Sequence, residues 1–191
     1  MRISSTENIK WSTENEISAE KGSELLIGDA VGAEKYSVLQ AREDYPHLDL
    51  IQSECQCGDG NNTWEYVMYT YHLIRHYFRV GVRANVYWNM ALENGGLSTW
   101  GRRQNSLISI DGGEYSYNPE FYVLKHFAHF AKKGAVMLST VGEMSSNAAV
   151  FKNKDGSVVM NILNPYEFKK AVTVGDKNYR LKPRSFNTVM L

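Results

Sequence analysis

The segment from Leu48 to Gly81 constrains the fold most, because it changes from strand-like to helix-like sequence across one short loop. The run Leu48–Ile51 is short and apolar, which is typical of a buried strand. The loop Gly58–Asn62 leads to Thr63, a favourable N-cap, and apolar residues then recur at helical spacing as far as Gly81. We therefore predict a strand, a loop and a helix in succession, which is the first part of a parallel crossover unit.

A second unit of the same kind follows. Arg83–Met90 is rich in β-branched and aromatic residues and is predicted to be a strand, and Leu107–Ile110 to be a shorter one. Asn118-Pro119-Glu120 combines an N-cap, a proline at the first helical position and an acid in the first turn, so a helix is expected from there to Gly134. Two such units imply parallel strands, but a closed barrel takes eight. The pattern is therefore part of something larger.

The residues on either side of these units have a different pattern. Before them, Leu25–Ile27 predicts a short strand and Glu34–Arg42 a helix that ends before Pro46. After Met137, a turn at 153–156 separates two apolar strands, and further short strands follow. The strands expected in this antiparallel module span 147–152, 157–163, 170–174, 179–181 and 185–191.

Charge and composition exclude several classes of partner. Lysine plus arginine equal aspartate plus glutamate, so the formal net charge is zero and no basic face is expected for nucleic acid. No apolar run approaches the roughly 20 residues of a membrane helix, and the first residues lack the apolar core of a signal peptide. The chain is rich in aromatics, with twelve Tyr, seven Phe and four Trp, whose ring faces suit stacking on sugars, although most are expected in the core.

Glu54 is the first candidate functional residue, because it follows the predicted strand Leu48–Ile51 directly. A carboxylate at the carboxyl end of a parallel strand stands where (β/α) barrels keep their chemistry. The alternative is a polar residue that only closes a strand. Trp88 and Asn89 occupy the corresponding position after the second strand, and the long loop that follows contains Gln104 and Asn105. Loops of this length are usually functional.

No metal or cofactor site is predicted. The two cysteines, Cys55 and Cys57, are too close for an unstrained disulfide, and no further ligands follow at zinc-site spacing. His72 and His76 share a helix face without the glutamate of a zinc-protease motif or a third ligand, so we interpret them as surface or packing residues.

The stretch from about Tyr45 to the C-terminus closely resembles the C-terminal part of glycoside hydrolase family 30, the glucosylceramidase and β-1,6-glucanase group. The likeness rests on short motifs that occur in order over about three quarters of the chain. They are Gln52-Ser53-Glu54, Tyr87-Trp88-Asn89-Met90-Ala91-Leu92, Gly95-Gly96 with Trp100, Asn118-Pro119-Glu120-Phe121-Tyr122, Lys125-His126-Phe127, Asp155-Gly156-Ser157 and Leu163-Asn164.

The resemblance implies a fold of mixed α/β and β class, the last two βα units of a (β/α)8 barrel followed by antiparallel β-sandwich strands. The expected division is a poorly defined segment 1–44, a partial barrel 45–136 and a β-sandwich domain 137–191. By the same resemblance, Glu54 is the catalytic nucleophile and Trp88 the floor of the sugar pocket. Gln56, Gln104 and Asn105 are implied to contact substrate.

The implied activity is retaining hydrolysis of a β-linked glucoside or glycan, with neither metal nor cofactor. The resemblance leaves the acceptor open among a ceramide, a β-1,6-glucan and another β-linked glycoside. Members of the family are usually secreted, periplasmic or lysosomal. The family's acid/base lies in an Asn-Glu-Pro motif on an earlier strand. Here Asn15-Glu16 is followed by Ile17, and only 37 residues separate Glu16 from Glu54.

We therefore expect a truncated chain that holds the nucleophile and lacks both the acid/base and the N-terminal barrel half. Alone it is expected to be inactive. The alternative is a non-catalytic remnant that acts as a carbohydrate-binding or interaction module.

Overall fold

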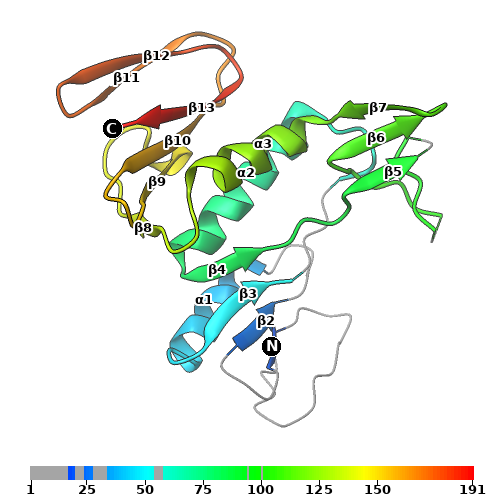
Figure 1. Ribbon diagram of the computed structural model, residues 1–191, viewed down its shortest axis with the longest axis horizontal. Helices are drawn as coiled ribbons and strands as arrows, with labels where there is room; N and C mark the ends of the chain where they lie inside the picture. The colour runs from blue at the N-terminus through cyan, green and yellow to red at the C-terminus, as the bar shows by residue number, and fades with distance from the viewer. Residues whose placement is uncertain (1–16, 20–23, 28–33, 54–57, 94, 100) are drawn as a thin grey trace.

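The computed structural model describes residues 17–19, 24–27, 34–53, 58–93, 95–99 and 101–191. Three β-sheets and a hairpin surround two central helices, α2 (Trp64–Arg79) and α3 (Pro119–Phe130). A mostly parallel sheet lies at the N-terminal end, the antiparallel strands lie at the C-terminal end, and a small three-stranded sheet extends beyond the start of α3 (Figure 1).

The first sheet contains the predicted parallel strands. Its order is β1-β2-β3-β4, in which β2, β3 and β4 run parallel and β1 is antiparallel to β2. Helix α1 connects β2 to β3, and α2 connects β3 to β4. The bounds are β1 (Ile17–Ala19), β2 (Glu24–Ile27), α1 (Glu34–Asp44), β3 (Asp49–Gln52) and β4 (Val82–Asn85). Strand β2 and α1 add one further strand–helix unit to the two expected.

The strand predicted over Arg83–Met90 is wrong in length, because β4 ends at Asn85. Beyond it the chain changes partner. The backbone N–H groups of Leu107 and Ile108 donate to the carbonyl oxygens of Asn89 and Met90, at 3.1 and 3.0 Å. The second half of the predicted strand therefore pairs with a different sheet.

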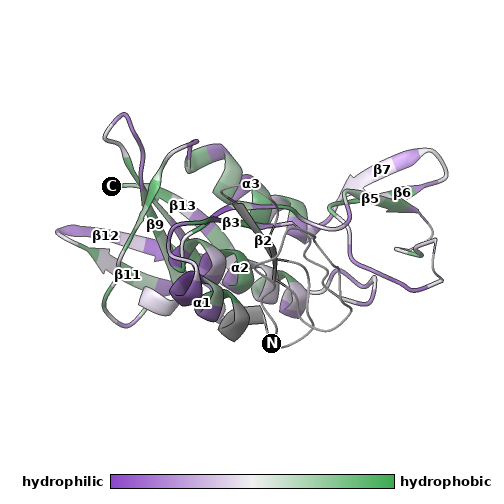
Figure 2. Cartoon of the chain, turned by 90° about the horizontal axis from the view of Figure 1, so that it is seen from below, coloured by the Kyte–Doolittle hydropathy of each residue, from purple (hydrophilic) through white to green (hydrophobic). Residues whose placement is uncertain are grey.

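That second sheet has the order β5-β6-β7, with β5 parallel to β6 and β6 antiparallel to β7. The strands are β5 (Ala91–Glu93), β6 (Ile108–Asp111) and β7 (Glu114–Tyr117). Gly112 and Gly113, both with positive φ, form the turn between β6 and β7. Figure 2 colours β7 as hydrophilic and β6 beside it as hydrophobic, and all four residues of β7 are exposed.

Helix α3 begins as predicted, with Asn118 at the N-cap and Pro119 at the first position. It ends at Phe130, earlier than the expected stop at Gly134. The amide of Asn153 explains the difference: its Nδ2 donates to the carbonyl of Phe130 at 3.1 Å, and its Oδ1 accepts from the N–H of Lys132 at 2.9 Å. A side chain from the hairpin turn thus satisfies the end of the helix.

The C-terminal strands are antiparallel, as predicted. One sheet has the order β13-β10-β9-β8, and β11 and β12 form a separate hairpin. Their bounds are β8 (Val136–Leu138), β9 (Ala148–Lys152), β10 (Val158–Asn164), β11 (Lys170–Val174), β12 (Lys177–Leu181) and β13 (Ser185–Met190), with a short 3₁₀ helix at Ser145–Asn147 before β9. A cleft of about 620 Å³ is lined by residues 138–145, by side chains of β9 and β10, and by β11.

Helix α2 joins the parallel sheet to the antiparallel one. On one face Leu73 and Tyr77 pack with α1, β3 and β4. On the other face Tyr71 and its neighbours pack with α3, β9 and β10, where Tyr71 Oη lies 2.7 and 2.8 Å from the carbonyl oxygens of Asn161 and Asn147. The C-terminal sheet β13-β10-β9-β8 and the β11–β12 hairpin, together called the sandwich, share a third apolar cluster. It includes Met160 and Ile162 of β10 and Leu181 of β12. In the part of the chain that the structure describes, no helix could span a membrane.

Candidate active-site edge

The carboxyl ends of β3 and β4 lie side by side, as parallel pairing requires. Asn85 Nδ2 donates to Gln52 Oε1 at 2.9 Å, and the N–H of Val86 donates to the carbonyl of Gln52 at 3.0 Å. Gln52 has no exposed surface. This pair of amide side chains fixes the last residue of each strand, and the chain leaves both strands at the same edge of the sheet.

The predicted nucleophile Glu54, together with Gln56 and the two cysteines, lies outside the described residues. The structure does describe what comes immediately before and after it. Strand β3 ends at Gln52, two residues before Glu54, and the chain is described again from Gly58. The chain therefore enters the segment that contains Glu54 from the edge where β4 also ends.

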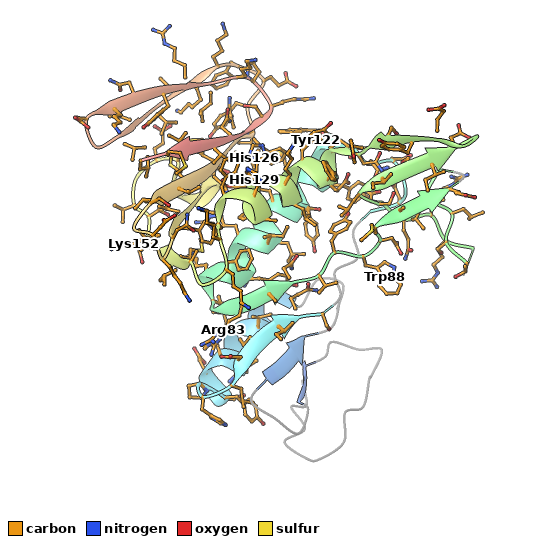
Figure 3. The ribbon with its side chains drawn as sticks, in the orientation of Figure 1. Arg83, Trp88, Tyr122, His126, His129 and Lys152 are labelled. Atoms are coloured by element: carbon orange, nitrogen blue, oxygen red, sulfur yellow. The ribbon has the colours of Figure 1, made fainter. Side chains whose placement is uncertain are left out.

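Trp88 lies three residues beyond β4, on the stretch that connects this sheet to β5 (Figure 3). Its side chain is partly buried, and the peptide bond to Asn89 is cis. Asn89 Nδ2 donates to Gln104 Oε1 at 2.9 Å, and Gln104 is almost fully buried. The structure thus brings Gln104 next to the residue that follows Trp88, which places two of the sequence-predicted residues in one neighbourhood.

The loop between β3 and α2 interlocks with the loop between β5 and β6, and glycines make the contact possible. A Cβ on Gly96 would stand 2.2 Å from the carbonyl oxygen of Gln104, and one on Gly60 would stand 2.8 Å from the carbonyl oxygen of Gly95. Both glycines also have positive φ. Larger residues would push the loops apart, so the glycine-rich sequence is required by this close approach.

Asn105 lies behind the loop that follows Glu54 and has no exposed surface. Its Oδ1 accepts from the N–H groups of Gly60 and Asn62, at 2.9 and 3.3 Å, and its Nδ2 donates to Glu120 Oε1 at 2.7 Å. Sequence reasoning placed Asn105 near the sugar; in this structure its amide contacts protein groups.

Glu120 is the residue that sequence reasoning missed. In the sequence it is an ordinary acid in the first turn of a helix, and nothing in that pattern distinguishes a buried carboxyl from an exposed one. In the structure it is fully buried, and burial raises the pKa of its carboxyl. Its Oε2 has no hydrogen-bond partner among the described residues.

The histidines of α3 lie away from this edge. Figure 3 labels His126 and His129 on α3; His129 is exposed, and His126 Nδ1 lies 2.7 Å from Thr188 Oγ1 of β13. Within the described ranges, no group of three or more His, Cys, Asp or Glu residues could hold a metal ion.

Comparisons with known proteins locate this fold. No family model and no curated protein matches the sequence. Solved structures do match. SrfJ from Salmonella typhimurium aligns over 87% of this chain with a TM-score of 0.71 and 20% identity. An endo-β1,6-glucanase aligns over 85% with a TM-score of 0.72 and 21% identity. The catalytic domain of a family 30 xylanase C from Talaromyces cellulolyticus aligns over 75% with a TM-score of 0.59 and 20% identity.

In each of these three alignments the chain spans 40% of the length of the matched structure. At such low identities the likeness concerns the fold, and it agrees with the resemblance seen in the sequence. The described α/β part and antiparallel strands have the fold of the C-terminal portion of glycoside hydrolase family 30 structures.

Proposed function

We propose that this chain carries the nucleophile part of a retaining β-glycoside hydrolase site, with Glu54 as the nucleophile. One observation supports this most. The segment that contains Glu54 starts two residues after β3, at the edge where β4 delivers Trp88 and Asn89. The carboxyl ends of parallel strands are the usual place for catalytic groups in α/β enzymes of this type.

The chemistry proceeds in two displacements. A carboxylate oxygen of Glu54 bonds to the anomeric carbon while the glycosidic C–O bond breaks and the leaving oxygen takes a proton from a second carboxylic acid. Water, deprotonated by that second group, then attacks the anomeric carbon and releases Glu54. In retaining enzymes the two carboxyl groups stand roughly 5–5.5 Å apart.

We assign the second carboxyl group to residues outside these 191. Glu16 follows an asparagine, but Ile17 stands where the family has a proline, and Glu16 lies outside the described residues. Asp59, close to Glu54 in sequence, is exposed and accepts from the N–H and Nδ2 of Asn61, at 3.1 and 2.8 Å. It is therefore engaged in its own loop.

The surrounding groups would bind the sugar. Trp88 would form the floor beneath the ring at the reacting carbon, and Gln104 would help to shape the pocket through Asn89. Gln56, two residues after Glu54, would reach the same pocket. Asn105 would act from behind the loop, consistent with its full burial.

The substrate class is a β-linked glucoside or glycan. The matched structures are described as an endo-β1,6-glucanase and as family 30 xylanases. These names favour a polysaccharide over glucosylceramide as the substrate of the proposed site. Xylose differs from glucose by the missing hydroxymethyl group, so matched glucosyl and xylosyl reagents distinguish the two sugars directly.

A 2-deoxy-2-fluoro-β-glycosyl fluoride tests the proposal, because fluoride leaves without a strong acid and the fluorinated sugar stays on the nucleophile. We expect the purified chain to release one equivalent of fluoride in a single burst from either the glucosyl or the xylosyl reagent. Glu54→Gln should release none, whereas the exposed Glu114→Gln should behave like the wild type. No burst from either reagent would contradict the proposal.

Turnover of an ordinary aryl β-glucoside by the same chain should be negligible, because loss of acid/base assistance alone costs about 10²–10⁴ in rate. Clear turnover that Glu54→Gln abolishes would place the acid/base within these residues and overturn that assignment.

The second candidate function is a non-catalytic carbohydrate-binding module. Exposed aromatic rings favour it, since Tyr115, Tyr117 and Tyr122 are exposed around the start of α3. Such a module would bind soluble β-glucan with equal affinity in the wild type and in Glu54→Gln, and it would give no fluoride burst.

A further inference from the structure

The buried amide of Asn105 holds the loop after Glu54. Asn105 Oδ1 accepts from two backbone N–H groups, those of Gly60 and Asn62, so one side chain fixes both ends of a short turn. The amide lies so close to the backbone of Gly58 that only glycine fits at that position. A Cβ on Gly58 would stand 2.4 Å from Asn105 Oδ1.

Glu120 sets the orientation of that amide. An asparagine side chain can be turned over, exchanging its oxygen and nitrogen, with little change in shape. Here Glu120 Oε1 accepts from Asn105 Nδ2 at 2.7 Å, and this leaves Oδ1 facing the loop. Removing the acceptor at Glu120 would leave a buried N–H donor unsatisfied and would remove the reason for this orientation.

The position of Glu120 is set in turn by the rest of the molecule. It lies in the first turn of α3, and Val123 and Phe127 of the same helix pack against α2 and the antiparallel sheet. A second chain of hydrogen bonds links the start of α3 to the same loop. Asn118 Nδ2 donates to the carbonyl of Ser106 at 2.9 Å, and the N–H of Ser106 donates to Asn62 Oδ1 at 3.2 Å. The start of α3 therefore holds the loop at two points.

We propose that Glu120 is a positioning residue for the nucleophile: through Asn105 it fixes the loop Gly58–Asn62, from which the chain leads back to Glu54 within four residues. This rests on the proposed role of Glu54. Glu120 does not touch substrate, and its effect is transmitted by the Asn105 amide. The sandwich and α3 thereby act on the site as its rigid support.

Variants at Glu120 test this with two measurements. Amide hydrogen exchange at Gly60 and Asn62 reports the hold on the loop, and the rate of fluoride release reports the placement of Glu54. Glu120→Gln keeps an oxygen acceptor and should leave both near wild-type values. Glu120→Ala removes a hydrogen bond and should change each by about tenfold, with exchange faster and fluoride release slower. The exposed Glu114→Ala, five residues before the helix begins at Pro119, is the matched control.

Exchanging the amide and the carboxyl group between positions 105 and 120 gives a reversed pair. This pair should restore fluoride release lost in a single variant, which a merely structural residue would not do. Asn105→Asp places a second carboxyl group against Glu120, so fluoride release should fall as pH rises and both groups ionise. Combining Asn105→Asp with Glu120→Gln restores one donor and one acceptor in reversed order. The double variant should recover fluoride release and lose that pH dependence.

Each outcome is decisive. If Glu120→Ala speeds exchange at Gly60 and Asn62 but leaves fluoride release unchanged, the positioning role is wrong while the role of Glu54 stands. If Glu120→Ala does not fold, the reversed pair decides, and failure of the double variant to recover over Asn105→Asp overturns the proposal. If the wild type gives no burst, Glu54 is not the nucleophile and the positioning proposal fails with it, whereas the exchange data still report the Asn105 contact.

Discussion

The antiparallel sheet and the β5–β7 sheet differ in how their residues are covered. Six of the seven residues of β10 are buried, between helices on one side and the sandwich cluster on the other. All four residues of β7 are exposed. The first region is stabilised by apolar burial within the chain. The second is held by backbone pairing and a few ring contacts, such as that between Tyr117 and Phe121, whose ring centroids are 4.1 Å apart. Apolar burial thus stabilises the antiparallel sheet far more than the β5–β7 sheet.

The same contrast holds for buried polar groups. In the sandwich, Asn161 donates to the carbonyl of His126 at 2.9 Å and accepts from Thr188 Oγ1 at 2.8 Å. At the site edge, Glu120 keeps one buried oxygen without a partner in the described part of the chain. Full satisfaction is typical of a structural core, and an unsatisfied buried carboxyl is typical of a functional region.

Phe127→Ala should have the largest effect on stability. Phe127 is nearly fully buried between α2, β9 and β10, and removal of such a ring costs about 3–5 kcal/mol in unfolding free energy. Urea denaturation followed by circular dichroism measures it. Val141→Ala is the control, because Val141 is 96% exposed, and it should leave the unfolding free energy unchanged. A loss below 1 kcal/mol for Phe127→Ala would show that the helices do not depend on the sandwich.

Tyr71→Phe should have the next largest effect. The hydroxyl is buried against the carbonyl oxygens of Asn147 and Asn161, and its removal leaves both of them without this donor. The expected cost is about 1–3 kcal/mol, with the apolar packing of the ring retained. Thermal melts of the variant and the wild type measure it, and an unchanged melting temperature would mean that water replaces the hydroxyl.

Glu120→Gln should act through pH. Burial raises the pKa of Glu120 above its ordinary value of 4.5, so the protonated form favours folding. The stability from this group is fully present below pH 4.5 and is lost as pH rises through the raised pKa. Glutamine does not titrate, so the variant should lack this fall in unfolding free energy. Its stability relative to the wild type should therefore increase as pH rises. Parallel pH–stability curves would show that Glu120 does not titrate differently in the folded state.

Tyr115→Ala should have the smallest effect on stability. Tyr115 is 66% exposed on β7, and its ring makes an edge contact with the ring of Tyr117. Exposed substitutions of this kind usually stay within about 0.5 kcal/mol. A larger loss in the same urea assay would mean that the β5–β7 sheet contributes to the folded core after all.

Local pattern was enough to predict most elements but not their ends. The helix start at Asn118 and the turn at 153–156 were predicted because capping and turn preferences act over a few residues. The end of α3 was not, because Asn153 caps it from more than twenty residues away. β4 stops at Asn85 for a similar reason, since Asn89 pairs with Leu107 in another sheet.

The site was predictable to a comparable extent. The edge where β3 and β4 end, and the position of Trp88 beyond it, follow from parallel pairing, which the sequence predicts. The burial of Glu120 and its contact with Asn105 depend on how α3 packs against two loops. Such contacts between distant segments carry no local signal in a single sequence.

The central claim is that Glu54 is the nucleophile, and the most direct measurement is the residue on which a fluorinated sugar remains. After reaction with a 2-deoxy-2-fluoro-β-glycosyl fluoride, peptide mass spectrometry should locate the sugar on Glu54 and on no other residue. Glu54→Gln should carry no label. A sugar found on another carboxylate, or an unlabelled chain, would contradict the account.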